Sequence, residues 1–179
     1  MDKKNNIEEL QTRFHGAILQ VQRFGKTGLN CIWVETKRLR EVALGLRNDF
    51  GYVFLENLSV MQIDDALVLT YFLRSLVHNT YSDCLVLRVS VHLKKSENQI
   101  EVPSIAKLWE TARPFENESG ELFGIRYLNE DGTEQTVSGA KLPSGWSGYP
   151  LRKDYVFPRT FKGIRHERSW ADKETGGRT

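Results

Sequence analysis

Strict alternation of apolar and polar side chains in residues 86–93 constrains the fold more than any other feature of this sequence. Four aliphatic residues recur at every second position, which places them on one face of an extended strand: Leu87, Val89, Val91 and Leu93. Polar residues fill the positions between them: Arg88, Ser90 and His92. A sheet with one apolar face has to bury that face under another layer, such as helices.

A helix that can cover such a sheet is predicted at residues 39–50. Its apolar residues are spaced at i, i+3, i+4, i+7 and i+11 and form one continuous stripe: Leu39, Val42, Ala43, Leu46 and Phe50. Thr36 is a suitable N-cap because its hydroxyl can accept a hydrogen bond from a backbone N–H group. Gly51 stands where a left-handed residue is expected after the helix.

The remaining elements predict an α+β fold. In chain order they are a helix at 6–14, strands at 17–24 and 30–35, strands at 52–61 and 66–73, and helices at 105–112 and 115–123. Ser104 caps the first of these last two helices, Pro114 separates them, and Gly124 closes the second. We expect a mixed or antiparallel sheet with helices packed on one face, followed by a long extended C-terminal segment.

Residues 126–179 differ from the preceding part of the chain in pattern and in charge. No helical or alternating periodicity follows Gly124, yet aromatic residues continue: Tyr127, Trp146, Tyr149, Tyr155, Phe157, Phe161 and Trp170. Residues 150–179 carry 8 basic and 4 acidic side chains, whereas residues 101–135 carry 8 acidic and 3 basic ones. We therefore divide the chain into an α+β body, residues 1–125, and an extended aromatic and basic segment, residues 126–179, of a kind that can lie along another protein and become ordered there.

The sequence carries no recognisable catalytic or cofactor motif. Residues 24–27 resemble the end of a phosphate-binding loop, but Gln20 stands where its first glycine belongs. Iron–sulfur clusters usually take four cysteines, and this chain has two, Cys31 and Cys84. Its four histidines are scattered, without the helical i, i+4 spacing of a metal site. We expect no cofactor, no metal and no catalytic residue.

Three glutamates in the predicted helix at 115–123 are candidates for acid–base chemistry or for an acidic binding face: Glu116, Glu118 and Glu121. Acidic residues near a helix start are also favoured by the helix dipole, so they do not require a chemical role. Gly120 lies among them, and a glycine inside a helix costs about 1 kcal/mol relative to alanine. This glycine indicates either a close approach of backbone or an acidic face that meets a partner.

Three motifs resemble the 30-kDa-type subunit of respiratory complex I, which is also known as the C-type or J-type subunit. The first is V-P-S-I at residues 102–105, followed by Trp109 and Ala112. The second, E-N-E-S-G-E-L-F-G-I at residues 116–125, is similar to E-R-E-x-x-D-L-F-G-I. The third and most specific is L-P-x-x-W-x-G-x-P-L-R-K-D-Y at residues 142–155. Two departures are Asn117, in place of the arginine, and the lack of a G-H-P-D-L-R-R run in residues 131–140.

This resemblance implies a cofactor-free structural and assembly subunit in the hydrophilic arm of a proton-translocating NADH (or ferredoxin):quinone oxidoreductase. It implies a hetero-oligomer in which the chain packs against the 49-kDa-type large subunit and neighbouring iron–sulfur subunits. The chain would be non-catalytic when isolated. Other subunits would hold it, without membrane insertion, at the cytoplasmic face of the cell membrane, or at the matrix or stromal side in an organelle.

The same resemblance identifies the residues expected at the subunit interface. They are Glu116, Glu118, Glu121, Phe123, Gly124, Trp146, Pro150, Leu151, Arg152, Lys153, Asp154 and Tyr155. The equivalent subunit of a membrane-bound nickel–iron hydrogenase, or of a related complex, is an alternative that this chain alone leaves open. A nucleic-acid-binding module is a remote alternative, because the net charge is only +2 and no RNP-like aromatic run is present.

Overall fold

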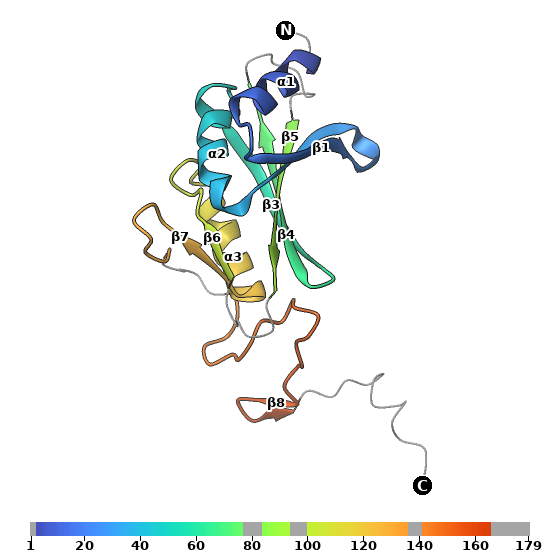
Figure 1. Ribbon diagram of the computed structural model, residues 1–179. Coiled ribbons are helices and arrows are strands. Elements are labelled where there is room, and N and C mark those ends of the chain that lie inside the picture. Colours follow the sequence, from blue (N-terminus) through green and yellow to red (C-terminus); the bar gives the residue numbers. More distant parts are fainter. Residues whose placement is uncertain (1–2, 77–83, 94–99, 136–140, 166–179) are drawn as a thin grey trace.

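The computed structural model describes residues 3–76, 84–93, 100–135 and 141–165 (Figure 1). A five-stranded sheet forms the body, with the strand order β1-β2-β5-β4-β3. These strands are β1 (Ile18–Phe24), β2 (Leu29–Val34), β3 (Phe54–Ile63), β4 (Ala66–Arg74) and β5 (Cys84–His92). The β2–β5 pair is parallel and the other three pairs are antiparallel. The predicted α+β class with a mixed sheet is confirmed.

The alternating segment forms β5, the middle strand of the sheet. Leu87 and Val89 are buried on one face, and Ser90 on the other face is exposed. Arg88 also lies on this second face, where its Nε donates a hydrogen bond to Thr70 Oγ1 at 3.1 Å. The alternation read from the sequence is therefore present, with the apolar side chains in the core.

Helix α2 (Leu39–Asn48) packs against the sheet, and α1 (Lys3–Arg13) lies beside it (Figure 1). The stripe predicted for α2 is buried along the helix: Leu39, Val42, Ala43 and Leu46. Gly45 allows the Phe14 ring to pack directly on the α2 backbone, because a Cβ at this position would collide with that ring. One close aromatic contact thus joins the end of α1 to the middle of α2.

The start of α2 differs from the prediction. Thr36 is not its N-cap, because a short 3-10 turn, η2 (Thr36–Arg38), precedes the helix. The Thr36 hydroxyl donates instead to the Ser90 carbonyl at 3.2 Å and so ties this turn to β5. At its other end, α2 stops at Asn48, two residues before the predicted end, and its C-cap is Asp49. Gly51 does adopt the expected left-handed conformation, with a φ of 70°.

Between residues 104 and 124 the structure has one helix, where the sequence predicted two. Residues 105–111 form successive turns, and α3 (Ala112–Phe123) begins only after them. Backbone carbonyls in and just before β3 hold these turns. Thr111 Oγ1 donates to the Leu55 carbonyl at 3.2 Å, and the buried Trp109 donates its Nε1–H to the Tyr52 carbonyl at 3.2 Å. Pro114 lies in the first turn of α3, where its missing N–H group costs nothing.

A second small sheet flanks α3, and the sequence did not predict it. Strands β6 (Ile100–Pro103) and β7 (Ile125–Leu128) pair in parallel. Arg40 of α2 clamps the ends of both strands, because its Nε donates to the Ser104 carbonyl at 3.1 Å and its Nη2 to the Leu128 carbonyl at 2.5 Å. The body therefore continues past Gly124 through β7.

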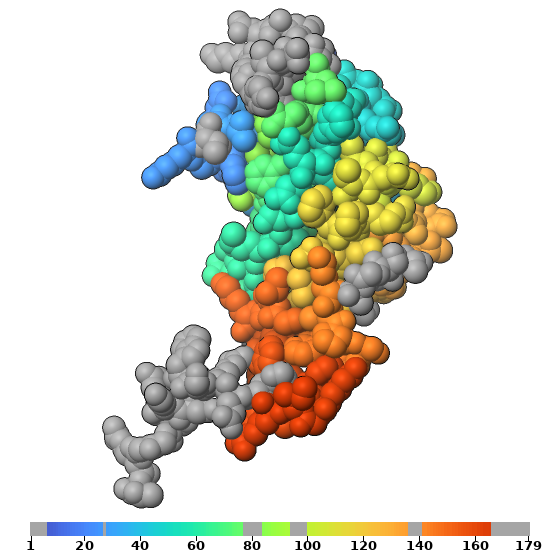
Figure 2. All heavy atoms as spheres, turned by 180° about the vertical axis from the view of Figure 1, so that it is seen from behind, coloured from blue at the N-terminus to red at the C-terminus, as the bar shows by residue number. Residues whose placement is uncertain are grey.

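The C-terminal segment forms a lobe at one end of the body, beyond the β3–β4 hairpin (Figure 2). Within its described part, residues 141–165, two short strands, β8 (Thr160–Phe161) and β9 (Ile164–Arg165), form a hairpin. Residues 136–140 and those after Arg165, including Trp170, lie outside the described residues. In the described part of the chain, none of the helices is both long and apolar enough to cross a membrane.

Candidate subunit interface

The C-terminal segment docks on the last turn of α3, where a helix leaves backbone carbonyl groups without partners. Leu151 N–H donates to the Leu122 carbonyl at 3.1 Å, and Arg152 Nε donates to the Phe123 carbonyl at 2.6 Å. A helix C-terminus carries partial negative charge, so a guanidinium group is favoured at this place. The second and third sequence motifs therefore meet in space.

Gly124 makes this contact possible. Its φ of 72° lies in the left-handed region, which glycine adopts without steric cost. A Cβ on Gly124 would lie 2.7 Å from Arg152 Nη2 and would also collide with the Tyr149 ring. The Arg152 guanidinium carbon lies 4.6 Å from the centroid of the same ring. Arg152 and Tyr149 thus cover the Gly124 backbone as a stacked pair, which we name the arginine latch.

Glu121 holds the beginning of the segment. Its Oε2 accepts the Lys141 N–H at 2.5 Å and its Oε1 accepts the Leu142 N–H at 3.0 Å. Both carboxylate oxygens are therefore bound to backbone of the same chain, and we name this contact the glutamate latch. Glu118, about one turn earlier in α3, is different: its side chain is 47% exposed, and its carboxylate lies 4.0 Å from Lys141 Nζ.

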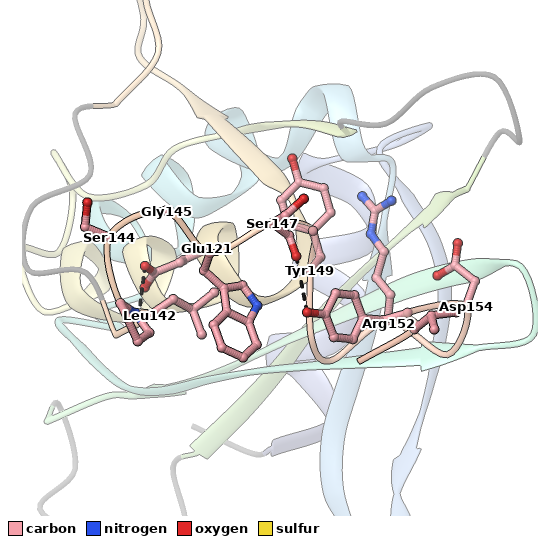
Figure 3. Close-up of a pocket in the computed structure, with 13 residues that line it drawn as sticks. Glu121, Leu142, Ser144, Gly145, Ser147, Tyr149, Arg152 and Asp154 are labelled. Carbon is pink, nitrogen blue, oxygen red and sulfur yellow. Dashed lines mark hydrogen bonds between the residues drawn. The ribbon is translucent and has the colours of Figure 1, made fainter. Parts of the chain in front are cut away.

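The chain between the two latches forms a loop around an open cleft of about 740 Å³ (Figure 3). Aromatic side chains shape this loop. Tyr155 packs on Gly148, which has no room for a Cβ, and its hydroxyl donates to the Ser147 carbonyl at 3.2 Å. Trp146 packs against Phe157, with 5.3 Å between the ring centroids. The loop is closed on the body by Lys153 N–H, which donates to Gln62 Oε1 of β3 at 2.8 Å.

Glu116 lies inside the body, away from the cleft. Its side chain is fully buried, and its Oε1 accepts the Ile105 N–H at 2.9 Å while its Oε2 lies 2.7 Å from Ser104 Oγ. Burial raises the pKa of Glu116 from an ordinary 4.5 to about 7, although these hydrogen bonds favour the charged form. Glu116 thus joins α3 to the turn that follows β6.

The same buried network reaches beyond β7. Ser104 Oγ lies 2.9 Å from Gln135 Oε1, and Gln135 Nε2 donates to Asn117 Oδ1 at 3.1 Å. Gln135 is 4% exposed, and its N–H donates to the Tyr127 carbonyl at 2.7 Å. Residues up to position 135 therefore contribute buried side chains to the body.

Gly120 has the close backbone approach that its place in α3 indicated. A Cβ on Gly120 would lie 2.8 Å from the Ile125 carbonyl oxygen. The helix and β7 can therefore pack together only because this residue has no side chain.

The residues expected at the interface fall into three groups. Three are buried within the chain: Glu116, Phe123 and Gly124. Five are partly buried, and most of these shape the loop or its latches: Glu121, Trp146, Pro150, Arg152 and Tyr155. Four are exposed: Glu118, Leu151, Lys153 and Asp154. Two further residues matter that the sequence did not single out for this site, Gln62 and Tyr149; Tyr149 was visible as an aromatic residue beside the third motif, whereas nothing marked Gln62.

Metal-binding geometry is absent from the part of the chain that the structure describes. No three His, Cys, Asp or Glu side chains in that part gather as a metal site would require. Both cysteines are free thiols on different strands, with Cys31 buried and Cys84 half-buried. Burial raises the pKa of each thiol, which makes it less reactive.

Comparison with known proteins decides the family. The family model for the respiratory-chain NADH dehydrogenase 30-kDa subunit matches residues 32–160, which include most of the sheet from β2 onward, α3 and both latches. This chain belongs to that family. The resemblance read from the motifs is therefore confirmed, and the 30-kDa-subunit family accounts for most of the chain.

Two curated relatives of this chain are much longer polypeptides. The chain is 34% identical over 160 residues to the C/D subunit of NADH-quinone oxidoreductase from Acinetobacter baumannii, covering 83% of this chain and 25% of that protein. The protein of the same name from a Psychrobacter species is 35% identical, with the same coverage. The chain therefore spans about a quarter of the length of these curated relatives.

A solved structure shows the same fold. The trypsin-resistant fragment (1-134) of Nqo5 matches with a TM-score of 0.53 at 20% identity, covering 75% of this chain and all of the fragment. At this identity the similarity establishes the fold of the body alone.

Proposed function

We propose that this chain is a cofactor-free assembly subunit of the hydrophilic arm of an NADH-quinone oxidoreductase. It joins a hetero-oligomer by binding the 49-kDa-type, or D-type, large subunit and neighbouring iron–sulfur subunits. The observation that carries this proposal is membership of the 30-kDa-subunit family, together with relatives whose name, C/D, couples a C part with a D part. Two parts that are joined in one polypeptide in relatives are expected to be neighbours when they are separate chains.

The exposed side of the C-terminal segment is the proposed binding surface. Large apolar side chains there meet solvent: Leu151 is 53% exposed, Val156 86% and Ile164 67%. Exposed apolar side chains that are rimmed by charge mark protein-binding surfaces. Lys153 and Asp154, beside Leu151, supply part of that rim.

Charge supports an acidic partner for the far end of this surface. The β8–β9 hairpin region carries three exposed basic residues and no acidic one: Arg159, Lys162 and Arg165. Such a patch accelerates encounter with a surface of opposite sign and specifies orientation. We propose that the complex holds the chain at the cytoplasmic face of the cell membrane.

We also propose that the folded body extends to residue 135 rather than to 125. A boundary after residue 125 would cut β7 (Ile125–Leu128) and would remove the buried Gln135. The segment that serves the interface then begins after this point and includes residues 141–165.

Co-purification tests the proposed function. The chain is co-expressed with a tagged D-type subunit of the same complex, and a Leu151→Glu/Val156→Glu variant is compared with the native chain. Charging two apolar side chains in an interface should weaken capture by about tenfold or more. Leu19→Glu is the matched control, because Leu19 is 66% exposed on β1 and remote from the segment. A native chain that does not co-purify, or a double variant that binds like the control, contradicts the proposal.

A further inference from the structure

A chain of buried polar side chains joins the turn after β6, the beginning of α3 and the stretch that follows β7. Its members are Ser104, Glu116, Asn117 and Gln135, and all four are buried. Glu116 Oε2 and Gln135 Oε1 lie 2.7 Å and 2.9 Å from the same atom, Ser104 Oγ. Gln135 Nε2 donates to Asn117 Oδ1 at 3.1 Å. Buried polar groups need hydrogen-bond partners, so the number of hydrogens in this chain decides which arrangement is stable.

The Ser104 hydroxyl supplies too few hydrogens when Glu116 is charged. This hydroxyl carries a single hydrogen, and it lies between two acceptors, the Glu116 carboxylate and the Gln135 amide oxygen. Ala106 N–H donates to the Ser104 oxygen at 3.2 Å and supplies neither acceptor. When Glu116 carries a proton, its O–H can donate to Ser104 Oγ, and the Ser104 O–H is then available for Gln135 Oε1. The chain of hydrogen bonds is therefore complete in the protonated form.

Loss of this proton redirects the donors around Glu116. Burial raises the pKa of Glu116 to about 7, and hydrogen bonds from Ser104 and Gln135 oppose this rise because they stabilise the charged form. In the charged form the Ser104 hydrogen therefore turns to the carboxylate, which leaves Gln135 Oε1 without a donor among the described residues. The Gln135 amide nitrogen is drawn to the same carboxylate and away from Asn117. The bonds that join Gln135 to Ser104 and Asn117 thus depend on the proton.

The groups that surround Glu116 leave it as the titrating member of this cluster. The phenols of Tyr71 on β4 and Tyr127 on β7 face it, together with the guanidinium of Arg113, about one turn earlier in α3. Burial raises the pKa of both phenols above the ordinary value of 10, so they stay neutral near pH 7. Arg113 is exposed and forms no ion pair with Glu116 in the described part of the chain. Glu116 is therefore the group whose charge changes near neutral pH.

Gln135 lies just before the C-terminal segment. Helix α3 holds the chain at Gln135 through Asn117, and again six residues later, where Glu121 accepts the Lys141 N–H. Asn117 and Glu121 are four residues apart and so lie on one side of the helix. The first of these two attachments belongs to the proton-dependent chain, and the second, the glutamate latch, lies outside it.

We propose that Glu116 is a proton-binding switch that fixes the start of the C-terminal segment on α3, so that the chain binds the large partner subunit more tightly with the proton than without it. The inference rests on the proposed function, in which this segment is the binding surface. A segment that is already held in place loses less conformational entropy on docking than one that moves. Because the pKa of Glu116 is about 7, binding weakens as pH rises through this value.

A pH titration of the isolated, full-length chain, followed by NMR, tests the switch without the partner. The carboxyl ¹³C resonance of Glu116 and the side-chain NH₂ resonances of Gln135, assigned with Gln135→Met, should move with one shared midpoint near pH 7. In Glu116→Gln the Gln135 resonances should not move with pH, because the new amide donates to Ser104 as the protonated carboxyl group does. Glu118→Gln, which changes an exposed carboxylate on the same helix, is the matched control and should keep the native titration.

Capture by the tagged D-type subunit at about pH 6 and about pH 8 tests the coupling to the partner. The native chain should bind about threefold to tenfold more weakly at the higher pH, which corresponds to the loss of about one hydrogen bond. This ratio is compared with that of Glu116→Gln, which should bind equally well at both pH values once any titration of the partner is removed by the comparison.

Two results in the isolated chain would overturn the switch: Gln135 resonances that stay in place while Glu116 titrates, or a Glu116 carboxyl group that does not titrate near neutral pH. Equal effects of pH on capture of the native chain and of Glu116→Gln would overturn its coupling to the partner. A native chain that is captured at neither pH contradicts the proposed function, whereas the NMR titration decides the switch independently.

Discussion

At the scale of single residues, one acidic run in α3 contains three different environments. Glu116 is buried, Glu118 is exposed, and Glu121 binds the backbone of the C-terminal segment. The sequence presented them as one cluster, and the helical repeat could have separated the first from the others. Glu116 is three residues before Ser119 and seven before Phe123, both of which are buried, so it belongs to the inner face of the helix. The sequence could not predict the hydrogen bonds with Ser104 and Ile105 that make burial of this carboxyl group possible.

Stability should depend on pH through Glu116. Its pKa is about 7 in the folded chain and near 4.5 when unfolded, so the folded state binds the proton more tightly. The folded state is therefore favoured most below about pH 4.5, and this contribution is lost as pH rises through about 7. The loss amounts to at most about 3 kcal/mol. Urea unfolding of the native chain and of Glu116→Gln at several values from about pH 5 to pH 8 measures it.

Glu116→Gln should remove most of this pH dependence, because the amide keeps an acceptor for the Ile105 N–H and cannot ionise. The control is Glu118→Gln, which should retain the native dependence because Glu118 is exposed. Parallel pH profiles for the native chain and Glu116→Gln would show that the buried carboxyl group does not titrate in this range.

At the scale of elements, the five-stranded sheet and α2 form where the sequence predicted strands and a helix, whereas the region around α3 differs from its prediction. In β5 the apolar residues repeat every two positions, and in α2 they repeat about every 3.6 positions. Both patterns run along most of the element, so the local sequence is enough to specify it. The turns at 105–111 bury Ile105 and Trp109 at helical spacing, yet hydrogen bonds to backbone in and just before β3 hold them as turns. Strands β6 and β7 have four residues each, which is too short for alternation to be recognised. Their pairing depends on contacts between residues that are distant in sequence.

Gly124→Ala should detach the C-terminal segment from α3. A left-handed conformation costs a non-glycine residue about 1–2 kcal/mol, and the new methyl group would also displace the arginine latch. Gly132→Ala is the matched control, because Gly132 has a φ of 80° but nothing within 4 Å of the added Cβ. Both variants should melt at a lower temperature than the native chain because of the strained backbone. The melting temperature of Gly124→Ala should be lower still, because it also loses the arginine latch.

Limited proteolysis separates the two effects of that substitution. Cleavage between positions 141 and 157 should be faster in Gly124→Ala than in Gly132→Ala by more than their difference in global stability accounts for, because only the first variant loses the docking contacts. Equal cleavage rates would mean that the Arg152–Tyr149 stack does not secure the segment.

At the scale of the whole molecule, the body and the C-terminal segment meet through few but specific contacts. In the sequence, recognisable helical or alternating periodicity ends at Gly124, and the predicted division of the chain is placed there. The sequence could not indicate that β7 and Gln135 still belong to the body, since their partners are β6 and Asn117. Nor could it show that the segment is attached to α3 through backbone carbonyls, a contact with no side-chain signature on the helix.

Truncations at two positions should separate folding from assembly. A chain that ends after residue 135 should melt cooperatively, with the body intact, and should fail to co-purify with the D-type subunit. A chain that ends after residue 127 should be less stable, because Leu128 supplies carbonyl contacts to Arg40 and Ser104 and Gln135 is buried. Removal of a buried hydrogen-bond partner costs about 1–3 kcal/mol for each group left unpaired. Equal stability of the two truncated chains, or assembly by the chain ending at 135, would contradict this division.

The parallel pairing of β2 with β5 also determines how the chain reaches its native state. Asn30 pairs with Leu85, 55 positions later, whereas β3, β4 and β5 pair with their sequence neighbours. Closing so long a loop loses chain entropy before the pair forms, which makes this a slow step. During synthesis, β2 of the β1–β2 hairpin cannot pair with β5 until β5 has left the ribosome. Until then its inner edge remains unpaired and able to associate with other chains, so we expect a demand for chaperone protection early in translation, before any partner subunit can bind.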